Sequence, residues 1–66
     1  METQTKLIKA HLEDGKTINP MEALKSYGCF RLAARIKNLK DSGMTIEKEM
    51  RQDENGKRYA VYWEVT

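Results

Sequence analysis

The apolar residues of this chain change their spacing once, at Gly43. Before Gly43 they recur at intervals of three and four residues, which is the spacing of amphipathic helices, whereas after it apolar and polar residues alternate. The alternation over residues 44–51 and 59–65 predicts two strands. Asn55-Gly56 lies between them and is a strong short signal for a hairpin. We therefore expect helices first and a β-hairpin last, which is an α+β order.

Glycines divide the helical part of the chain into three segments. The predicted helices cover about residues 3–14, 20–27 and 30–42. Each is followed by a glycine, the residue that most readily adopts the left-handed conformation with which many helices end.

The second helix has the clearest boundaries. Asn19 can cap its free amides, Pro20 suits the first helical position, and Glu22 can complete a capping box. Gly28 and Gly43 are each predicted to end a helix in a Schellman motif, because an apolar residue follows each of them.

The first and third helices each show one apolar stripe. On the opposite side of the third helix we expect Arg31, Ala34 and Asn38, with Arg35 on the flank. His11 lies on the stripe of the first helix and is expected to be a packed residue rather than a ligand. The predicted buried residues are Leu7, Ile8, His11 and Leu12 in the first helix, and Leu32, Ala33, Ile36 and Leu39 in the third.

A two-residue turn at Asn55-Gly56 would set the register of the hairpin. It would pair Met50 with Val61 and Ile46 with Val65, and it would place Tyr59 and Trp63 on that same face. Tyr62 would then be the aromatic residue on the polar face, where it could pack on the first helix, form a dimer contact or be exposed.

Length and composition exclude several classes of function. A chain of 66 residues predicts one domain, covering residues 1–66. The single cysteine, Cys29, cannot form an internal disulfide and is expected to be buried. The sequence has neither the spacing of a metal site nor a glycine-rich phosphate loop nor a convergent catalytic set, so we expect no metal, no cofactor and no enzymatic activity. It also lacks a signal peptide and a membrane-spanning run, which predicts a cytoplasmic protein.

The order of elements is that of a winged helix-turn-helix: a short helix, a tight turn, a longer helix and then a hairpin as the wing. The positive charge follows the same division. Residues 16–43 hold six basic and two acidic side chains, although the whole chain has a net charge of only +2. Because duplex DNA is a dense line of phosphates, this concentration of charge favours DNA as the partner.

Particular side chains suit that role. We expect the helix 30–42 to enter the major groove, where arginine reads guanine and asparagine reads adenine, while a small alanine allows close approach. Lys37 and Lys40 are expected to be surface charges. The candidate DNA-binding residues are Arg31, Arg35, Asn38 and Ala34 on the third helix, Asn19 at the start of the second, and Lys57 and Arg58 at the wing tip.

The segment from residue 17 to residue 43, with the pattern I-x-P-x-E-A-L followed by G-x-x-R-L-A-A-R-I-x-x-L-K-x-x-G, resembles the winged helix-turn-helix domain of small phage and prophage proteins. The resemblance extends over about residues 5–66. It implies a DNA-binding protein of a bacterial host cell, a transcriptional regulator or a recombination accessory factor, with Arg31 and Arg35 as basic residues of the recognition helix.

A second interpretation stays open from the sequence. The same fold could be a protein-interaction module that binds a host protein, which the acidic residues of the hairpin favour. A homodimer is also a candidate state, since DNA sites with two-fold symmetry usually require one.

Overall fold

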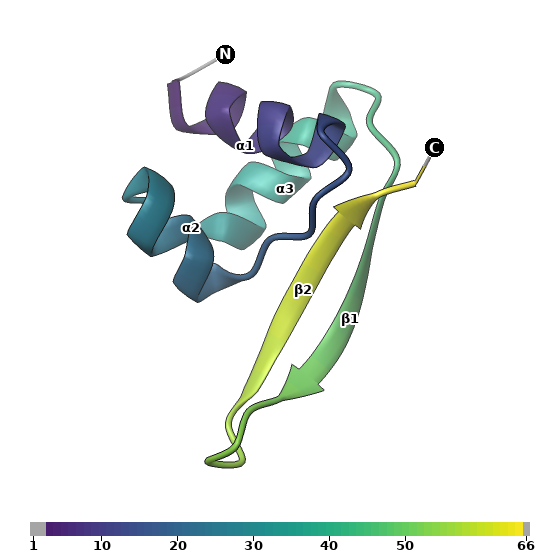
Figure 1. Cartoon of the computed structure of the whole chain (residues 1–66). Coiled ribbons are helices and arrows are strands. Elements are labelled where there is room, and N and C mark those ends of the chain that lie inside the picture. The colour runs from purple at the N-terminus through teal and green to yellow at the C-terminus, as the bar shows by residue number, and fades with distance from the viewer. Residues whose placement is uncertain (1–2, 66) are drawn as a thin grey trace.

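The computed structural model describes residues 3–65, which form three helices followed by two strands (Figure 1). The helices gather in one cluster, and the hairpin extends from it as an arm with its loop at the far end (Figure 1). This confirms the predicted order of elements and the fold class. The elements are α1 (Thr3–Glu13), α2 (Pro20–Tyr27), α3 (Leu32–Asp41), β1 (Ile46–Gln52) and β2 (Arg58–Glu64).

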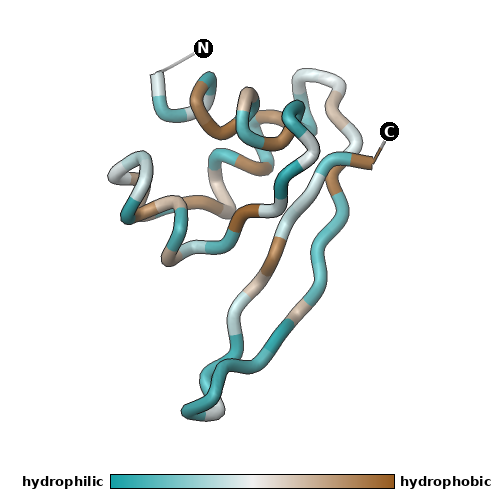
Figure 2. Tube along the Cα trace, in the orientation of Figure 1, coloured by the Kyte–Doolittle hydropathy of each residue, from teal (hydrophilic) through white to brown (hydrophobic). Residues whose placement is uncertain are grey.

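The core lies where the three helices meet the near half of the hairpin. Apolar positions recur along the three helices, and on the hairpin they lie at the start of β1 and midway along β2 (Figure 2). Burial of these side chains is the main term that stabilises so small a domain. The core consists of Ile8, Leu12, Ile18, Ala23, Cys29, Leu32, Ile36, Leu39, Ile46 and Tyr62.

Two residues of the predicted apolar stripes lie outside this core. Leu7 is 44% exposed, and Ala33 is exposed as well. In α1 the buried side consists instead of Thr5, Ile8 and Leu12, which recur at i, i+3 and i+7. A helix that contacts its neighbours along one narrow stripe leaves adjacent positions in solvent, so neighbours of a buried residue need not share its burial.

The predicted start of α2 is confirmed. The Glu22 N–H donates to Asn19 Oδ1 over 2.8 Å, and Pro20 is the first helical residue. This bond satisfies one of the amides that a helix leaves without an internal partner.

The two glycine endings are both present, but they differ in kind. Gly43 has a φ of 109°, and two hydrogen bonds close the end of α3 around it. The Met44 N–H donates to the Leu39 carbonyl over 3.1 Å, and the Gly43 N–H donates to the Lys40 carbonyl over 3.0 Å. This pair of bonds is a Schellman motif. At Gly28 the residue's own N–H donates to the Leu24 carbonyl over 3.0 Å, which is the simpler left-handed ending. The Schellman prediction is therefore right for α3 and wrong for α2.

The register of the hairpin differs from the predicted one by a single residue. Glu49 pairs with Val61, and Met50 pairs with Ala60. Ile46 consequently shares a face with Tyr62 rather than with the other two large aromatic residues of β2. The predicted apolar face is wrong, because a shift of one residue moves every side chain of one strand to the other side.

The loop explains the shift. A two-residue type I′ turn needs positive φ at both central residues, and here Gly56 alone has it, at 83°. The Gly56 N–H donates to the Asp53 carbonyl over 3.1 Å, and Asp53 Oδ1 accepts from the N–H groups of Asn55 and Lys57, each over 2.9 Å. This is the arrangement of a three-residue loop with a glycine bulge, which adds one residue between the strands.

Tyr62 is a core residue, which settles the alternatives left open for it. Its side chain is 7% exposed. Its backbone forms two hydrogen bonds with that of Ile18. The Ile18 N–H donates to the Tyr62 carbonyl over 2.9 Å, and the Tyr62 N–H donates to the Ile18 carbonyl over 2.8 Å. The link between α1 and α2 thus forms an isolated antiparallel bridge along the outer edge of β2, which fixes the hairpin to the helices.

His11 joins three segments from a nearly buried position. Its Nε2–H donates to the Thr17 carbonyl over 2.7 Å, so Nδ1 is free to accept the Tyr27 hydroxyl proton over 2.8 Å. The rings of His11 and Tyr27 also meet edge to face, with centroids 5.7 Å apart. The prediction of a packed histidine is confirmed.

Candidate DNA-binding surface

The turn between α2 and α3 places Arg31 immediately before the first residue of α3, at the N-cap position, rather than within the helix. Cys29 is drawn into the core, and its N–H donates to the Ala23 carbonyl over 3.1 Å. The chain therefore needs two more residues to reach the start of α3 at Leu32, and the predicted start at residue 30 is wrong. Arg31 is exposed, and its carbonyl accepts the first N–H groups of α3, from Ala34 and Arg35.

The outer side of α3 is polar and cationic. Leu32, Ile36 and Leu39 are buried, whereas Ala34 is half-buried. The exposed residues of the helix are Ala33, Lys37, Asn38, Lys40 and Asp41. Asn38 thus lies where the prediction placed it, and Lys37 and Lys40 add charge beside it.

A groove of about 360 Å³ separates one flank of α3 from the hairpin. Lys37 and Lys40 line it from the helix, and Lys48 lines it from β1. Glu47 is the acidic residue among its lining side chains. The remaining lining residues are Ala33, Ile36, Ile46 and Tyr62. With three lysines and one glutamate among its lining residues, the groove carries a net positive charge.

The hairpin continues this cationic side toward its loop. Because paired residues share a face, the strand register places Lys48, Met50 and Gln52 on the same side as Ala60 and Arg58. That side carries two basic residues, Lys48 and Arg58, and one acidic residue, Glu64, at the end of the hairpin far from its loop. The opposite side holds Glu47, Glu49, Arg51, Tyr59, Val61 and Trp63.

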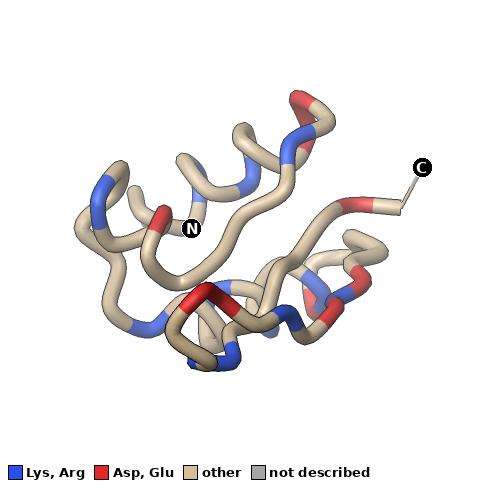
Figure 3. Tube along the Cα trace, turned by 60° about the horizontal axis from the view of Figure 1, so that its bottom comes forward, with Lys and Arg blue, Asp and Glu red and all other residues tan. Residues whose placement is uncertain are grey.

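The acidic side of the hairpin is partly neutralised within itself. Arg51 Nε lies 3.0 Å from Glu49 Oε2, so that pair presents little net charge. Seen from the lower end of the molecule, basic and acidic positions lie close together along the hairpin (Figure 3). The strand face with Lys48 carries two basic residues and one acidic residue, and the opposite face carries one basic residue and two acidic residues, so the two faces differ only slightly in charge.

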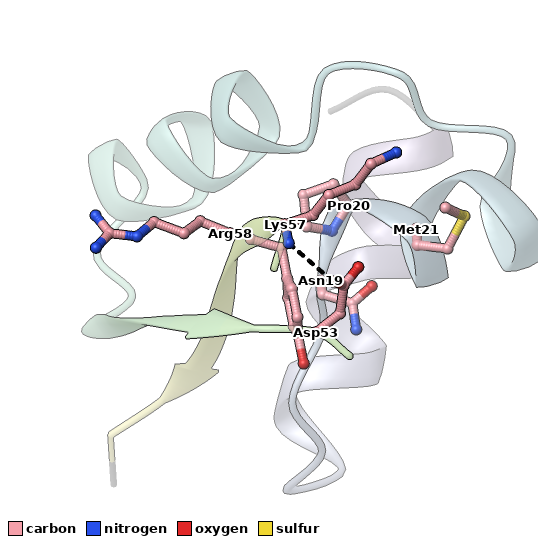
Figure 4. A pocket seen from close by; sticks show the side chains of 7 residues that line it. Asn19, Pro20, Met21, Asp53, Lys57 and Arg58 are labelled. Atoms are coloured by element: carbon pink, nitrogen blue, oxygen red, sulfur yellow. Dashed lines mark hydrogen bonds between the residues drawn. The ribbon is translucent and has the colours of Figure 1, made fainter. Parts of the chain in front are cut away.

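A second hollow, of about 380 Å³, lies between the start of α2 and the hairpin loop (Figure 4). It brings together three of the predicted residues: Asn19, Lys57 and Arg58. Figure 4 shows Lys57 extending past Pro20 and Arg58 pointing the other way, out of the hollow. Its further lining residues are Pro20, Met21, Asp53 and Tyr59.

Asp53 adds a negative charge to this hollow, but its carboxylate shapes the loop. The Oδ1 atom accepts the Lys57 N–H, the bond drawn in Figure 4, together with the N–H of Asn55. Asn19 likewise has its side-chain oxygen committed to the cap of α2.

Arg31 and Arg35 lie together at a third hollow, of about 200 Å³, at the end of α3 where the chain enters it. Arg35 is half-buried there, beside Phe30 and residues of α1 and the turn. Most of the predicted residues therefore form two groups, one at the start of α3 and one at the hairpin loop. Ala34 and Asn38 lie on α3 and line none of these three hollows.

Sequence reasoning missed the cationic groove. Lys37 and Lys40 were predicted as plain surface charges, although Ala33, Lys37 and Lys40 recur at i, i+4 and i+7 and so share one flank. Lys48 joins them only through the true register of the hairpin, which the sequence pattern did not reveal.

Comparison with known families agrees with this geometry. No helix within residues 3–65 is long and apolar enough to cross a membrane. No curated protein and no solved structure matches the sequence. The model of a winged helix-turn-helix domain matches residues 3–63, which is nearly the whole chain, and the protein therefore belongs to the winged helix-turn-helix domain family.

Proposed function

We propose that this protein binds duplex DNA in a sequence-specific manner, with α3 in the major groove and the hairpin as the wing beside it. The observation that carries the proposal is the continuity of positive charge from α3 to the hairpin, through Lys37, Lys40 and Lys48. Membership of a winged helix-turn-helix family supports DNA as the partner. Transcriptional regulation or assistance to recombination, in the cytoplasm of a bacterial host of a phage or prophage, is the role that this binding would serve.

The side chains divide into two kinds of contact. Arg31, at the entrance of α3, and Asn38, on its exposed side, are proposed to read base edges, because both can form paired hydrogen bonds there. Arg35 is proposed as a further contact on the same flank, and Ala34 as the small residue that lets the helix approach.

A second set is proposed to hold the phosphate backbone without reading sequence. Lys37, Lys40 and Lys48 would contact the phosphates of one DNA strand along the groove between α3 and the hairpin. Arg58 would contact phosphates nearer the hairpin loop. Asn19 and Lys57 flank the start of α2, where the helix dipole favours a phosphate. Such contacts position a protein on the duplex and make its affinity depend on salt.

The test is selection of bound duplexes from a random pool, followed by binding isotherms at several salt concentrations. Lys37→Ala is expected to lower the affinity for all duplexes alike and to reduce the slope of log K against log salt by about one. Arg31→Ala is expected to cost about 1–3 kcal/mol and to relax the preference at one position.

Lys6→Ala is the matched control, because Lys6 is an exposed lysine of α1 on another element. It should leave both the affinity and the salt slope unchanged. Binding that does not vary with salt, or a Lys6→Ala variant as weak as Lys37→Ala, would contradict the proposal.

One observation favours a protein partner as the alternative. The other face of the hairpin holds two acidic residues, Glu47 and Glu49, next to the half-buried aromatic residues Tyr59 and Trp63. A host protein retained from a bacterial lysate after nuclease treatment, and lost with Glu49→Lys, would support this alternative, because Glu49 lies on this face and does not line the groove beside α3. Loss of every retained protein on nuclease treatment would support DNA binding.

A further inference from the structure

Phe30 is the most exposed large apolar side chain in residues 3–65, with 84% of its surface accessible. Its neighbours explain why it cannot turn inward. Cys29 occupies the inward position before it, and Leu32 takes the next one as α3 begins.

The backbone around Phe30 is held on both sides. The Cys29 N–H donates to the Ala23 carbonyl, and the side chain of Gln4 in α1 donates to the Gly28 carbonyl over 3.1 Å. On the other side, the Arg31 carbonyl accepts N–H groups from the first turn of α3. These bonds fix the backbone on both sides of Phe30 and keep its side chain in solvent, so little backbone freedom is left to lose on binding.

The position of the ring indicates what it contacts. Phe30 stands at the entrance of α3, the end of a recognition helix that lies nearest to base edges in helix-turn-helix complexes. Arg31 follows it directly, and the segment 16–43 that contains both has six basic and two acidic side chains. The partner should therefore be polyanionic overall and offer an apolar group at the centre of the contact. The major groove of DNA offers one such group, the C5 methyl of thymine.

We propose that Phe30 reads sequence by packing on the C5 methyl group of a thymine in the bound duplex, next to the base that Arg31 contacts. This inference rests on the proposed function and deepens it, since it names the base read at one position. Burial of one methyl group changes an equilibrium about fourfold, which sets the size of the expected effect.

The experiment uses the selected duplex with each thymine replaced in turn by deoxyuridine, which removes the methyl group and keeps every hydrogen bond. For the wild-type protein, one replacement is expected to lower the affinity about fourfold. Phe30→Ala should bind the thymine and deoxyuridine duplexes equally at that position, and Phe30→Leu should retain part of the difference. Leu7→Ala, an exposed apolar residue of α1, should keep the full difference.

Thermal melting of the variants keeps the result interpretable, and Phe30→Ala should melt as the wild type does because the ring packs on so little of the protein. A fourfold difference that survives in Phe30→Ala, or a wild-type protein indifferent to every replacement, overturns the assignment of Phe30 while leaving DNA binding intact. A wild-type protein that binds no duplex at any salt concentration overturns the proposed function itself.

Discussion

Replacing Asn19 separates its two roles, as the cap of α2 and as a neighbour of the wing tip. In Asn19→Ala the acceptor of the 2.8 Å bond from the Glu22 N–H is lost, and that part-buried amide has no substitute in the side chain of alanine. The backbone bond from the Ala23 N–H to the Asn19 carbonyl remains, and the extended φ of −126° suits alanine without strain. The cost is therefore that of the cap alone, about 1 kcal/mol.

For a domain of this size, a loss of 1 kcal/mol lowers the melting temperature by about 4–8 °C. Far-UV circular dichroism during heating measures it directly. The matched variant is Asn19→Asp, which keeps the acceptor and adds a negative charge at the positive end of the α2 dipole. Asn19→Asp should melt at the wild-type temperature or slightly above.

The same variants behave differently toward DNA. Asn19→Asp places a carboxylate in the hollow that Lys57 and Arg58 line, so it should weaken duplex binding while the fold is unharmed. An Asn19→Ala protein with an unchanged melting temperature would refute the capping argument. An Asn19→Asp protein that binds duplexes as tightly as the wild type would refute the placement of a phosphate at the start of α2.

Three further changes test the packing and the helix ends. Leu39→Ala removes a fully buried side chain and should lower the free energy of unfolding by about 2–5 kcal/mol, a large share of the total stability of such a domain. The midpoint of urea unfolding should therefore fall sharply, and a midpoint near that of the wild type would contradict the assignment of the core. His11→Phe keeps a ring but leaves the Thr17 carbonyl and the Tyr27 hydroxyl without their partner, which should lower the free energy of unfolding in urea by about 1–3 kcal/mol. Tyr27→Phe should cost less, because it removes only the bond between Tyr27 and His11. Equal stability of the wild type and His11→Phe would argue against these two hydrogen bonds. Gly43→Ala places a residue with a side chain at a φ of 109°, although the added Cβ would meet no atom within 4 Å. The backbone strain should lower the free energy of unfolding by about 1–3 kcal/mol. A variant as stable as the wild type would exclude backbone strain at the end of α3.

Helix boundaries could be predicted wherever one residue dictates the local backbone. The start of α2 follows from the side-chain oxygen of Asn19 and from Pro20, and the end of α3 follows from Gly43, since each acts on atoms a few residues away. The start of α3 could not be predicted in this way. Arg31 provides no side-chain cap, and the helix begins late because Cys29 is pulled into the core by tertiary packing.

The hairpin shows how one residue limits prediction from sequence. Asn55-Gly56 correctly located the turn, but two loop geometries suit that pair, and they differ in length by one residue. The hydrogen bonds of Asp53 with the N–H groups of Asn55 and Lys57 favour the longer loop. The face of every residue in one strand changed with that choice, so Tyr62 was misplaced and the alignment of Lys48 with α3 was missed.

The candidate site was predictable to the extent that it depends on helical periodicity. The exposure of Asn38 follows from its spacing from Leu39 and Ile36, and it was correctly expected. The half-buried position of Arg35 depends on how α3 sits against the turn and α1, which no local pattern encodes.

The central claim is that α3 and one face of the hairpin together form the surface that contacts duplex DNA. The most direct measurement is a titration of the ¹⁵N-labelled protein with its selected duplex, followed through the backbone amide signals. The signals that move most should belong to Arg31, Lys37, Asn38, Lys48 and Arg58, while those on the outer side of α1 should stay in place. Shifts concentrated on α1, or on the acidic face of the hairpin, would contradict it.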